Sequence, residues 1–104
     1  MIPDSILLKR IKHLCVLAER QLKDRSMADL AQDVHLKDQV VKYLEGIGSS
    51  AYHLSYDFKA EHRDADWKSL VSFSDITPDT PVYEIWVAAS MTVPEVLTQL
   101  EEMR

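Results

Sequence analysis

The sequence predicts an all-α fold, a four- or five-helix up-down bundle that forms one domain over residues 1–104. Only two glycines and four prolines occur, and no Asn-Gly or Asp-Gly pair separates alternating apolar runs, so the signals of β-hairpins are missing. Apolar residues recur every three or four positions, the spacing of an amphipathic helix. They make up 46% of the chain against 28% charged residues, a balance typical of globular proteins.

The first helix is predicted to open at Pro3, Asp4 and Ser5, which suit a first helical turn, and to end at about Arg25. Cys15 lies on its apolar side, where a small buried thiol is expected. Apolar residues that recur every three or four positions form one core-facing stripe: Leu7, Ile11, Leu14, Ala18 and Leu22.

Ser26 followed by Asp29 indicates an N-cap and a short connecting helix over Met27 to Asp33. A second long helix is predicted to begin at His35 or Leu36. It carries the strongest periodic signal in the chain, with apolar residues at alternating spacings of four and three: Val40, Leu44, Ile47, Ala51, Leu54 and Phe58.

Small residues gather in the middle of this second helix, where each glycine costs roughly 1 kcal/mol relative to alanine. Such residues let a neighbouring helix approach closely, either within the bundle or across a two-fold axis, while a local kink is the alternative. We expect an interface formed by Gly46, Gly48, Ser49 and Ala51, and a homodimer as its consequence.

The C-terminal third is predicted to hold a short helix anchored by Trp67 and ending near Ser74. Thr80-Pro81 has the form of an N-cap with proline at the first helical position, so a fourth helix should follow. Its expected buried side is Val82, Ile85, Trp86 and Ala89. The sequence Thr92-Val93-Pro94-Glu95 has the form of a capping box that begins another helix.

The charge pattern argues against a general nucleic-acid binder. The net charge is −5, and residues 1–25 hold six basic against three acidic residues (+3), which leaves −8 for the remainder. A local RNA contact stays open through the cluster Lys9, Arg10, Lys12 and His13. The single cysteine favours a reducing compartment, so we expect a cytoplasmic protein, and no apolar run is long enough to cross a membrane.

No phosphate-binding glycine loop and no nucleophile signature occurs, so no cofactor is expected. His53 and Asp57 have the four-residue spacing that places two ligands on one helical face. Zinc normally needs three or four ligands, so we expect no metal site.

One segment resembles a known family. Residues 38–51 read Asp-Gln-Val-Val-Lys-Tyr-Leu-Glu-Gly-Ile-Gly-Ser-Ser-Ala, Trp67 follows Asp66, and Trp86 precedes Pro94 by eight residues. This order over residues 29–100 resembles the HepT-like family of helical toxin-antitoxin proteins. The matching positions of the first segment are Asp38, Val40, Leu44, Glu45, Ile47, Gly48 and Ala51, and the departures are Tyr43 and Ser49.

The resemblance implies a helical toxin that cuts RNA with an Arg, a His and often a Tyr between the two tryptophans. Here the interval from Trp67 to Trp86 contains neither Arg nor His. RNA cleavage needs proton transfer and a cation that steadies the phosphorane, so we expect the activity to be absent. The resemblance also implies a nucleotidyltransferase antitoxin that adds AMP to the motif's tyrosine. Tyr83 is the candidate here, and a packing role at the start of the fourth helix is the alternative for this aromatic residue.

The sequence therefore leaves three hypotheses. The first is a divergent HepT-like protein without ribonuclease activity that associates with itself or with a nucleotidyltransferase-type partner. The second is a ribonuclease toxin whose active groups have moved to His62 and Arg63, aided by the basic first helix. The third is a helical adaptor unrelated to toxin-antitoxin systems.

Overall fold

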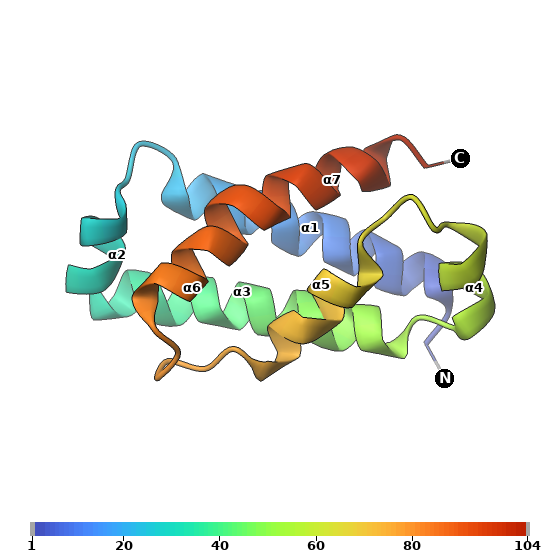
Figure 1. Cartoon of the computed structure of the whole chain (residues 1–104), viewed down its shortest axis with the longest axis horizontal. Coiled ribbons are helices and arrows are strands. Elements are labelled where there is room, and N and C mark those ends of the chain that lie inside the picture. Colours follow the sequence, from blue (N-terminus) through green and yellow to red (C-terminus); the bar gives the residue numbers. More distant parts are fainter. Residues whose placement is uncertain (1, 104) are drawn as a thin grey trace.

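The computed structural model describes residues 2–103, which form three long helical rods joined by shorter elements (Figure 1). The rods are α1 (Asp4–Leu22), α3 (Val34–His53) and a continuous run of α6 (Val82–Val87), the π-helical segment η2 (Ala88–Thr92) and α7 (Val93–Glu101). The shorter elements are α2 (Met27–Gln32), α4 (Tyr56–Glu61), α5 (Trp67–Ser72) and the 3-10 turn η1 (Phe73–Asp75). This part of the chain contains no strand, so the all-α prediction is confirmed.

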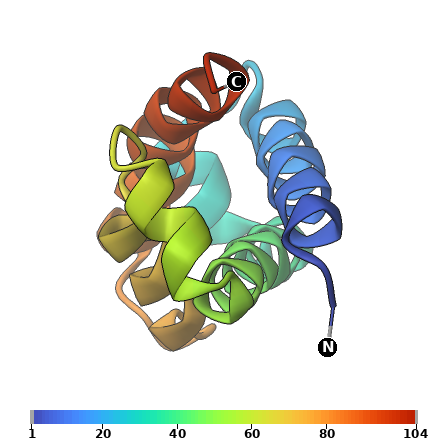
Figure 2. The ribbon, with the colours of Figure 1, turned by 90° about the vertical axis from the view of Figure 1, so that its right-hand side faces the viewer.

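The helices α1 and α3 lie side by side and run in opposite directions, and they form the most extensive helix contact of the molecule (Figures 1 and 2). The α6–α7 run packs against α1, while α5 and η1 pack against α3. The short helices α2 and α4 lie at opposite ends of a molecule that measures 41 × 24 × 18 Å. The core forms where the apolar faces of the three rods and α5 meet.

The helix α1 buries most of the stripe that its spacing predicts, although Leu14 is only half-buried. It ends at Leu22, three residues before the expected Arg25. The backbone leaves helical geometry at Lys23, whose ψ is 128°, and Asp24 follows with a left-handed φ of 61°, so the helix does not continue to Arg25.

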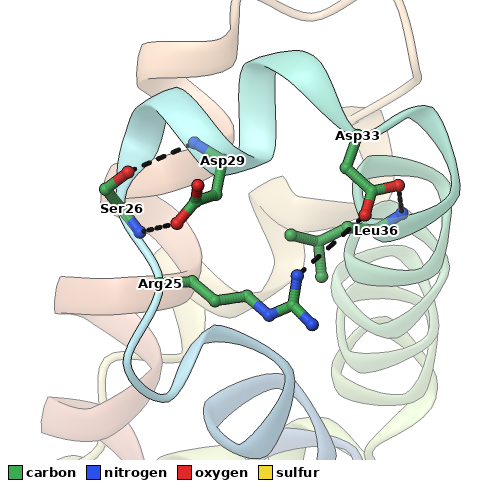
Figure 3. A network of polar contacts seen from close by, with 5 residues as sticks. All are labelled: Arg25, Ser26, Asp29, Asp33 and Leu36. Atoms are coloured by element: carbon green, nitrogen blue, oxygen red, sulfur yellow. Dashed lines mark hydrogen bonds and ion pairs between the residues drawn. The ribbon is translucent and has the colours of Figure 1, made fainter.

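Capping side chains begin the next two helices (Figure 3). Ser26 Oγ accepts from the Asp29 N–H at 3.2 Å, and the Asp29 carboxylate accepts from the Ser26 N–H at 2.8 Å, so the predicted cap is confirmed as a full capping box. Asp33 accepts from the Leu36 N–H at 3.1 Å and starts α3. Arg25 reaches the same Asp33 carboxylate at 4.0 Å and ties the two caps together.

The second long helix ends earlier than its periodicity predicts. It stops at His53, and Leu54 is extended, so Phe58 belongs to the separate helix α4. Ser55 holds this break because its Oγ caps the Phe58 N–H at 3.1 Å, and its own N–H and Oγ donate to Asp4 at 2.9 and 2.7 Å. The expectation that Asp57 shares a helical face with His53 was therefore wrong.

The small residues of α3 permit close approach inside the molecule. A Cβ on Gly48 would clash with the Ser74 backbone nitrogen and would lie 2.8 Å from the Phe73 carbonyl carbon. A Cβ on Gly46 would lie 2.9 Å from Leu14 Cδ1 of α1. Of the two packing alternatives, contact within the bundle therefore accounts for both glycines.

The last two predicted helices are one rod. The helix α7 begins at Val93, where the sequence predicts it, with Thr92 at its N-cap position. Thr92, however, has helical φ and ψ and makes no capping hydrogen bond, so the predicted capping box is absent and α7 continues the preceding segment without a break. The Thr80 hydroxyl accepts from the Thr77 N–H at 2.9 Å inside the loop, and Pro81 stands at the N-cap of α6 in its place. Pro94 is accommodated by the wider π turn before it, because an ordinary α-helical turn would bring its ring against the carbonyl four residues back.

Candidate functional site

The π segment η2 lies between two surface clefts. In it, the Val93 N–H donates to the carbonyl of Ala88, five residues back, which widens the turn. Ala88 and Thr92 line one cleft, whereas Ala89 and Ser90 line the other. Single π turns inside α-helices are frequently found at functional sites. The two clefts beside this segment are therefore candidate functional sites.

The first cleft, which we name the acidic cleft, has a volume of about 420 Å³ and lies between α5, η1, the following loop and α6. Its polar lining consists of hydroxyl groups and two carboxylates: Ser69, Ser72, Asp75, Thr80, Tyr83, Glu84 and Thr92. No arginine, lysine or histidine lines it. A phosphorane would meet carboxylates there rather than the cation that RNA cleavage requires.

Tyr83 stands at this cleft with 65% of its surface exposed. We expected a helix-start aromatic to be either a packing residue or a modification site. Its exposure is unlike that of a packing residue, and its hydroxyl is accessible to an incoming protein.

The second cleft, which we name the Trp86 cleft, has a volume of about 370 Å³ and lies between the end of α1 and the α6–α7 rod. Trp86 was expected in the core but is only half-buried, and its indole forms one wall. The remaining apolar lining is Leu22, Ala89 and Pro94, and the polar lining is Glu19, Arg20, Lys23 and Ser90.

Two of these polar groups are basic and exposed. Arg20 and Lys23 stand three residues apart at the end of α1 and thus on neighbouring positions of one helix face. Within residues 2–103 neither forms an ion pair. Ser90 donates its hydroxyl to the Trp86 carbonyl, so its hydrogen is already used. Positive charge without an internal partner therefore borders an apolar cleft.

The alternative catalytic pair lies elsewhere. His62 is the C-cap of α4, its ring packs on Phe58 with centroids 4.5 Å apart, and its carbonyl accepts from the Trp67 indole at 2.8 Å. Arg63 follows as an exposed loop residue. Neither residue lines the acidic cleft or the Trp86 cleft. Because α4 and the start of α6 lie toward opposite ends of the molecule, the fold does not bring His62 and Tyr83 together (Figure 1).

The expected interface residues divide between the interior and the surface. Gly48 is buried and Ala51 has 0% exposure, so neither offers surface to a second copy. Gly46 is half-buried beneath Leu14. Ser49 alone is exposed, and its carbonyl lies 2.8 Å from His53 Nδ1.

The basic cluster of α1 is also separate from both clefts. Lys9, Arg10 and His13 are exposed and Lys12 is half-buried, and none of them lines either cleft. They stand in the first two-thirds of α1, whereas the two basic residues of the Trp86 cleft stand at its end.

The remaining reactive groups form no further centre. Across residues 2–103, no group of three His, Cys, Asp or Glu side chains is placed to hold a metal ion. Cys15 is fully buried, and desolvation, with the nearby Glu19 charge, raises the pKa of its thiol to about 12. No helix of the described chain is long and apolar enough to span a membrane.

Comparison with known protein families, with curated proteins and with solved structures finds no match. The HepT-like resemblance therefore stays a prediction that rests on the residues that carry it.

Sequence reasoning missed the Trp86 cleft because it placed Trp86 in the core. The available signal was the pair Arg20 and Lys23 at the C-terminal end of the first helix. Arg20 and Lys23 are far from Trp86 in the sequence, and their proximity in space depends on how α1 packs against η2 and α7.

Proposed function

We propose that this protein works by associating with other protein chains and has no ribonuclease activity. The observation that supports this most directly is the Trp86 cleft, where a half-buried indole and two basic residues that form no ion pair within residues 2–103 border an apolar floor. Exposed aromatic and arginine side chains are the residues that most often anchor protein interfaces.

The arrangement of titratable groups favours association over catalysis. General acid–base chemistry requires donor and acceptor within hydrogen-bond reach of one reacting atom. His62 and Arg63 lie near α4, Tyr83 lies at the acidic cleft, and the buried thiol of Cys15 is protonated at neutral pH. These groups do not share a site.

In its finer form, the proposal is a divergent, cytoplasmic HepT-like protein that pairs with a second copy or with a nucleotidyltransferase-type partner. The exposed hydroxyl of Tyr83 is the position at which such a partner would attach AMP. A helical adaptor unrelated to toxin-antitoxin systems is the alternative. A neighbouring reading frame with a nucleotidyltransferase signature would favour the first form.

Incubation with total tRNA tests the absence of ribonuclease activity. We expect wild-type protein and the His62→Ala and Arg63→Ala variants to leave the tRNA equally intact. Cleavage by the wild type that is lost in either variant would overturn the proposal in favour of a ribonuclease with displaced active groups.

Light scattering and intact mass spectrometry test the association. We expect a dimer of this chain, or a stable complex with a co-expressed minimal nucleotidyltransferase in the presence of ATP. In that complex, AMP transfer should add one adenylyl group to the wild type and none to the Tyr83→Phe variant. A monomer that forms no complex would contradict the proposal, and an unchanged mass in a stable complex would remove only the modification.

A further inference from the structure

The Trp86 cleft combines three properties that together specify the chemistry of a ligand. Leu22 and Ala89 form an apolar floor that is itself well buried, with exposures of 7% and 1%. The Trp86 indole forms a wall, and Pro94 adds a rigid apolar edge. A bulky apolar group placed there would lose contact with water on several sides.

The charged residues of the Trp86 cleft lie at its rim. Arg20 and Lys23 are exposed, and only Glu19 among the lining residues is acidic, so the local charge is +1. The C-terminal end of a helix also favours cations, and within residues 2–103 neither Arg20 nor Lys23 forms an ion pair. An anionic group on the ligand would gain from both residues.

The size and shape of the cleft favour a peptide segment over an enclosed small molecule. Its volume of about 370 Å³ is near the lower end of the roughly 300–1,000 Å³ found for small-molecule sites. It is also open along the groove between α1 and the α6–α7 rod. One large side chain fits the floor while the neighbouring residues of its chain remain at the rim.

The whole chain carries a net charge of −5, but the uneven distribution of this charge favours the approach of an acidic segment to α1. Residues 1–25 carry +3 and the remainder carries −8, so an acidic segment is attracted to α1 and repelled elsewhere. Such asymmetry orients an encounter before contact is made.

We propose that the Trp86 cleft binds an acidic segment of a partner protein, with one aromatic or large aliphatic side chain on the floor and flanking carboxylates paired with Arg20 and Lys23. This inference rests on the proposed function, since it names the chemistry of the partner that the association surface accepts.

The test uses a fluorescein-labelled peptide of sequence Gly-Asp-Glu-Asp-Phe-Glu-Asp and the full chain, with binding followed by anisotropy. We expect saturable binding to the wild type. The double variant Arg20→Glu, Lys23→Glu should bind at least about tenfold more weakly, because two ion pairs at the rim are replaced by repulsion between like charges. The variant Lys9→Glu, Arg10→Glu is the matched control, since it changes the charge of α1 equally outside the cleft.

Two further probes test the floor. A peptide with Ser in place of Phe, and one with Asn and Gln in place of the acidic residues, should each bind more weakly than the parent. Unlabelled parent peptide should change the tryptophan emission of the wild type. The Trp86→Phe variant should lose this change and bind the labelled peptide more weakly, because a smaller ring forms the wall of the cleft. Trp67 remains in that variant as an internal reference, because it is 8% exposed and outside the cleft.

Equal weakening by both double variants would overturn the inference, since it would show diffuse attraction to α1. Absent binding to the wild type, or equal binding of the neutral peptide, would overturn it as well. A dimer or partner complex that persists in the Arg20→Glu, Lys23→Glu variant would refute the assignment to this cleft and leave the association itself standing. If the protein forms neither a dimer nor a partner complex but still binds the peptide, the proposed association is refuted and the assignment of the peptide site to this cleft stands.

Discussion

Single residues set how closely the elements of this protein pack. The two glycines of α3 illustrate this, because they meet different neighbours. Gly48 faces the backbone of Ser74 and Phe73, which belongs to η1 and is held by helical hydrogen bonds. Gly46 faces the end of the flexible Leu14 side chain. The same substitution should therefore have different effects two residues apart.

We expect Gly48→Ala to destabilise the protein by about 1–3 kcal/mol, the usual cost of overpacking, because backbone atoms must move. Gly46→Ala is the matched control. There the gain of up to about 1 kcal/mol in helix propensity offsets the displacement of Leu14, so stability should change little. Urea unfolding followed by circular dichroism measures both, and equal losses would show that the approach of η1 is not the cause.

A second residue pair joins the start of α1 to the break after α3. Asp4 accepts from the N–H and Oγ of Ser55, and these two hydrogen bonds hold the pKa of the Asp4 carboxyl below its ordinary value of 3.8. Because the folded pKa is lower than the unfolded one, the ionised form stabilises the fold. That contribution is complete above pH 3.8 and is lost as the pH falls through the folded pKa.

The Asp4→Asn variant should accordingly melt at a lower temperature than the wild type near neutral pH. The difference between the two melting temperatures should shrink as the pH is lowered below 3.8. In a Ser55→Ala background, Asp4→Asn should produce a smaller pH-dependent difference, because the Oγ bond to Asp4 is lost while the backbone N–H of residue 55 still donates to it. A gap that stays constant with pH would show that the carboxylate charge does not contribute.

At the scale of elements, two segments have the sequence form of a helix N-cap, but only one of them makes the hydrogen bonds of a cap. Ser26 and Asp29 form a capping box, whereas Thr92, in a sequence of the same form, lies inside a continuous rod. The difference lies in the chain that precedes each residue. Before Ser26, the preceding helix has ended and the backbone at Asp24 is left-handed. Before Thr92, α6 and the π turn form a continuous helix.

Ser26→Ala should therefore destabilise the protein by about 1 kcal/mol, the typical value for loss of an N-cap. Thr92→Ala should stay within about 0.5 kcal/mol of the wild type, as for surface positions without such a role. Thermal unfolding of the two variants side by side gives the comparison. A loss at Thr92 as large as that at Ser26 would mean that the rod is interrupted after all.

At the scale of the whole molecule, α1 packs against both of the other long helical rods. It packs along α3, contacts α7 and η2, and contributes Arg20, Leu22 and Lys23 to the Trp86 cleft. Its buried side carries Cys15, whose thiol is covered on all sides. Exposure of this thiol therefore requires α1 to leave the core.

Labelling of Cys15 by a chromogenic disulfide reagent should measure that event. The raised pKa, about 12, keeps the thiol protonated at neutral pH, and burial blocks the reagent, so native protein should react slowly. The rate should rise with urea in parallel with global unfolding. A Cys15→Ala, Ser49→Cys variant, whose thiol is exposed, should react at once in the native state. Fast, urea-independent labelling of the wild type would show that α1 opens on its own.

The sequence by itself determined the helical class, the buried stripes of α1 and α3, the Ser26 cap and the short helix at Trp67. These follow from local spacing and local hydrogen bonds, which neighbouring residues specify. Only the tertiary structure decided that α3 breaks at Leu54, that Pro94 sits inside a rod, and that Trp86 lies at the surface beside Arg20 and Lys23. Each of these depends on a contact between distant segments, the bond of Asp4 to Ser55 or the packing of α1 on η2, which periodicity cannot encode.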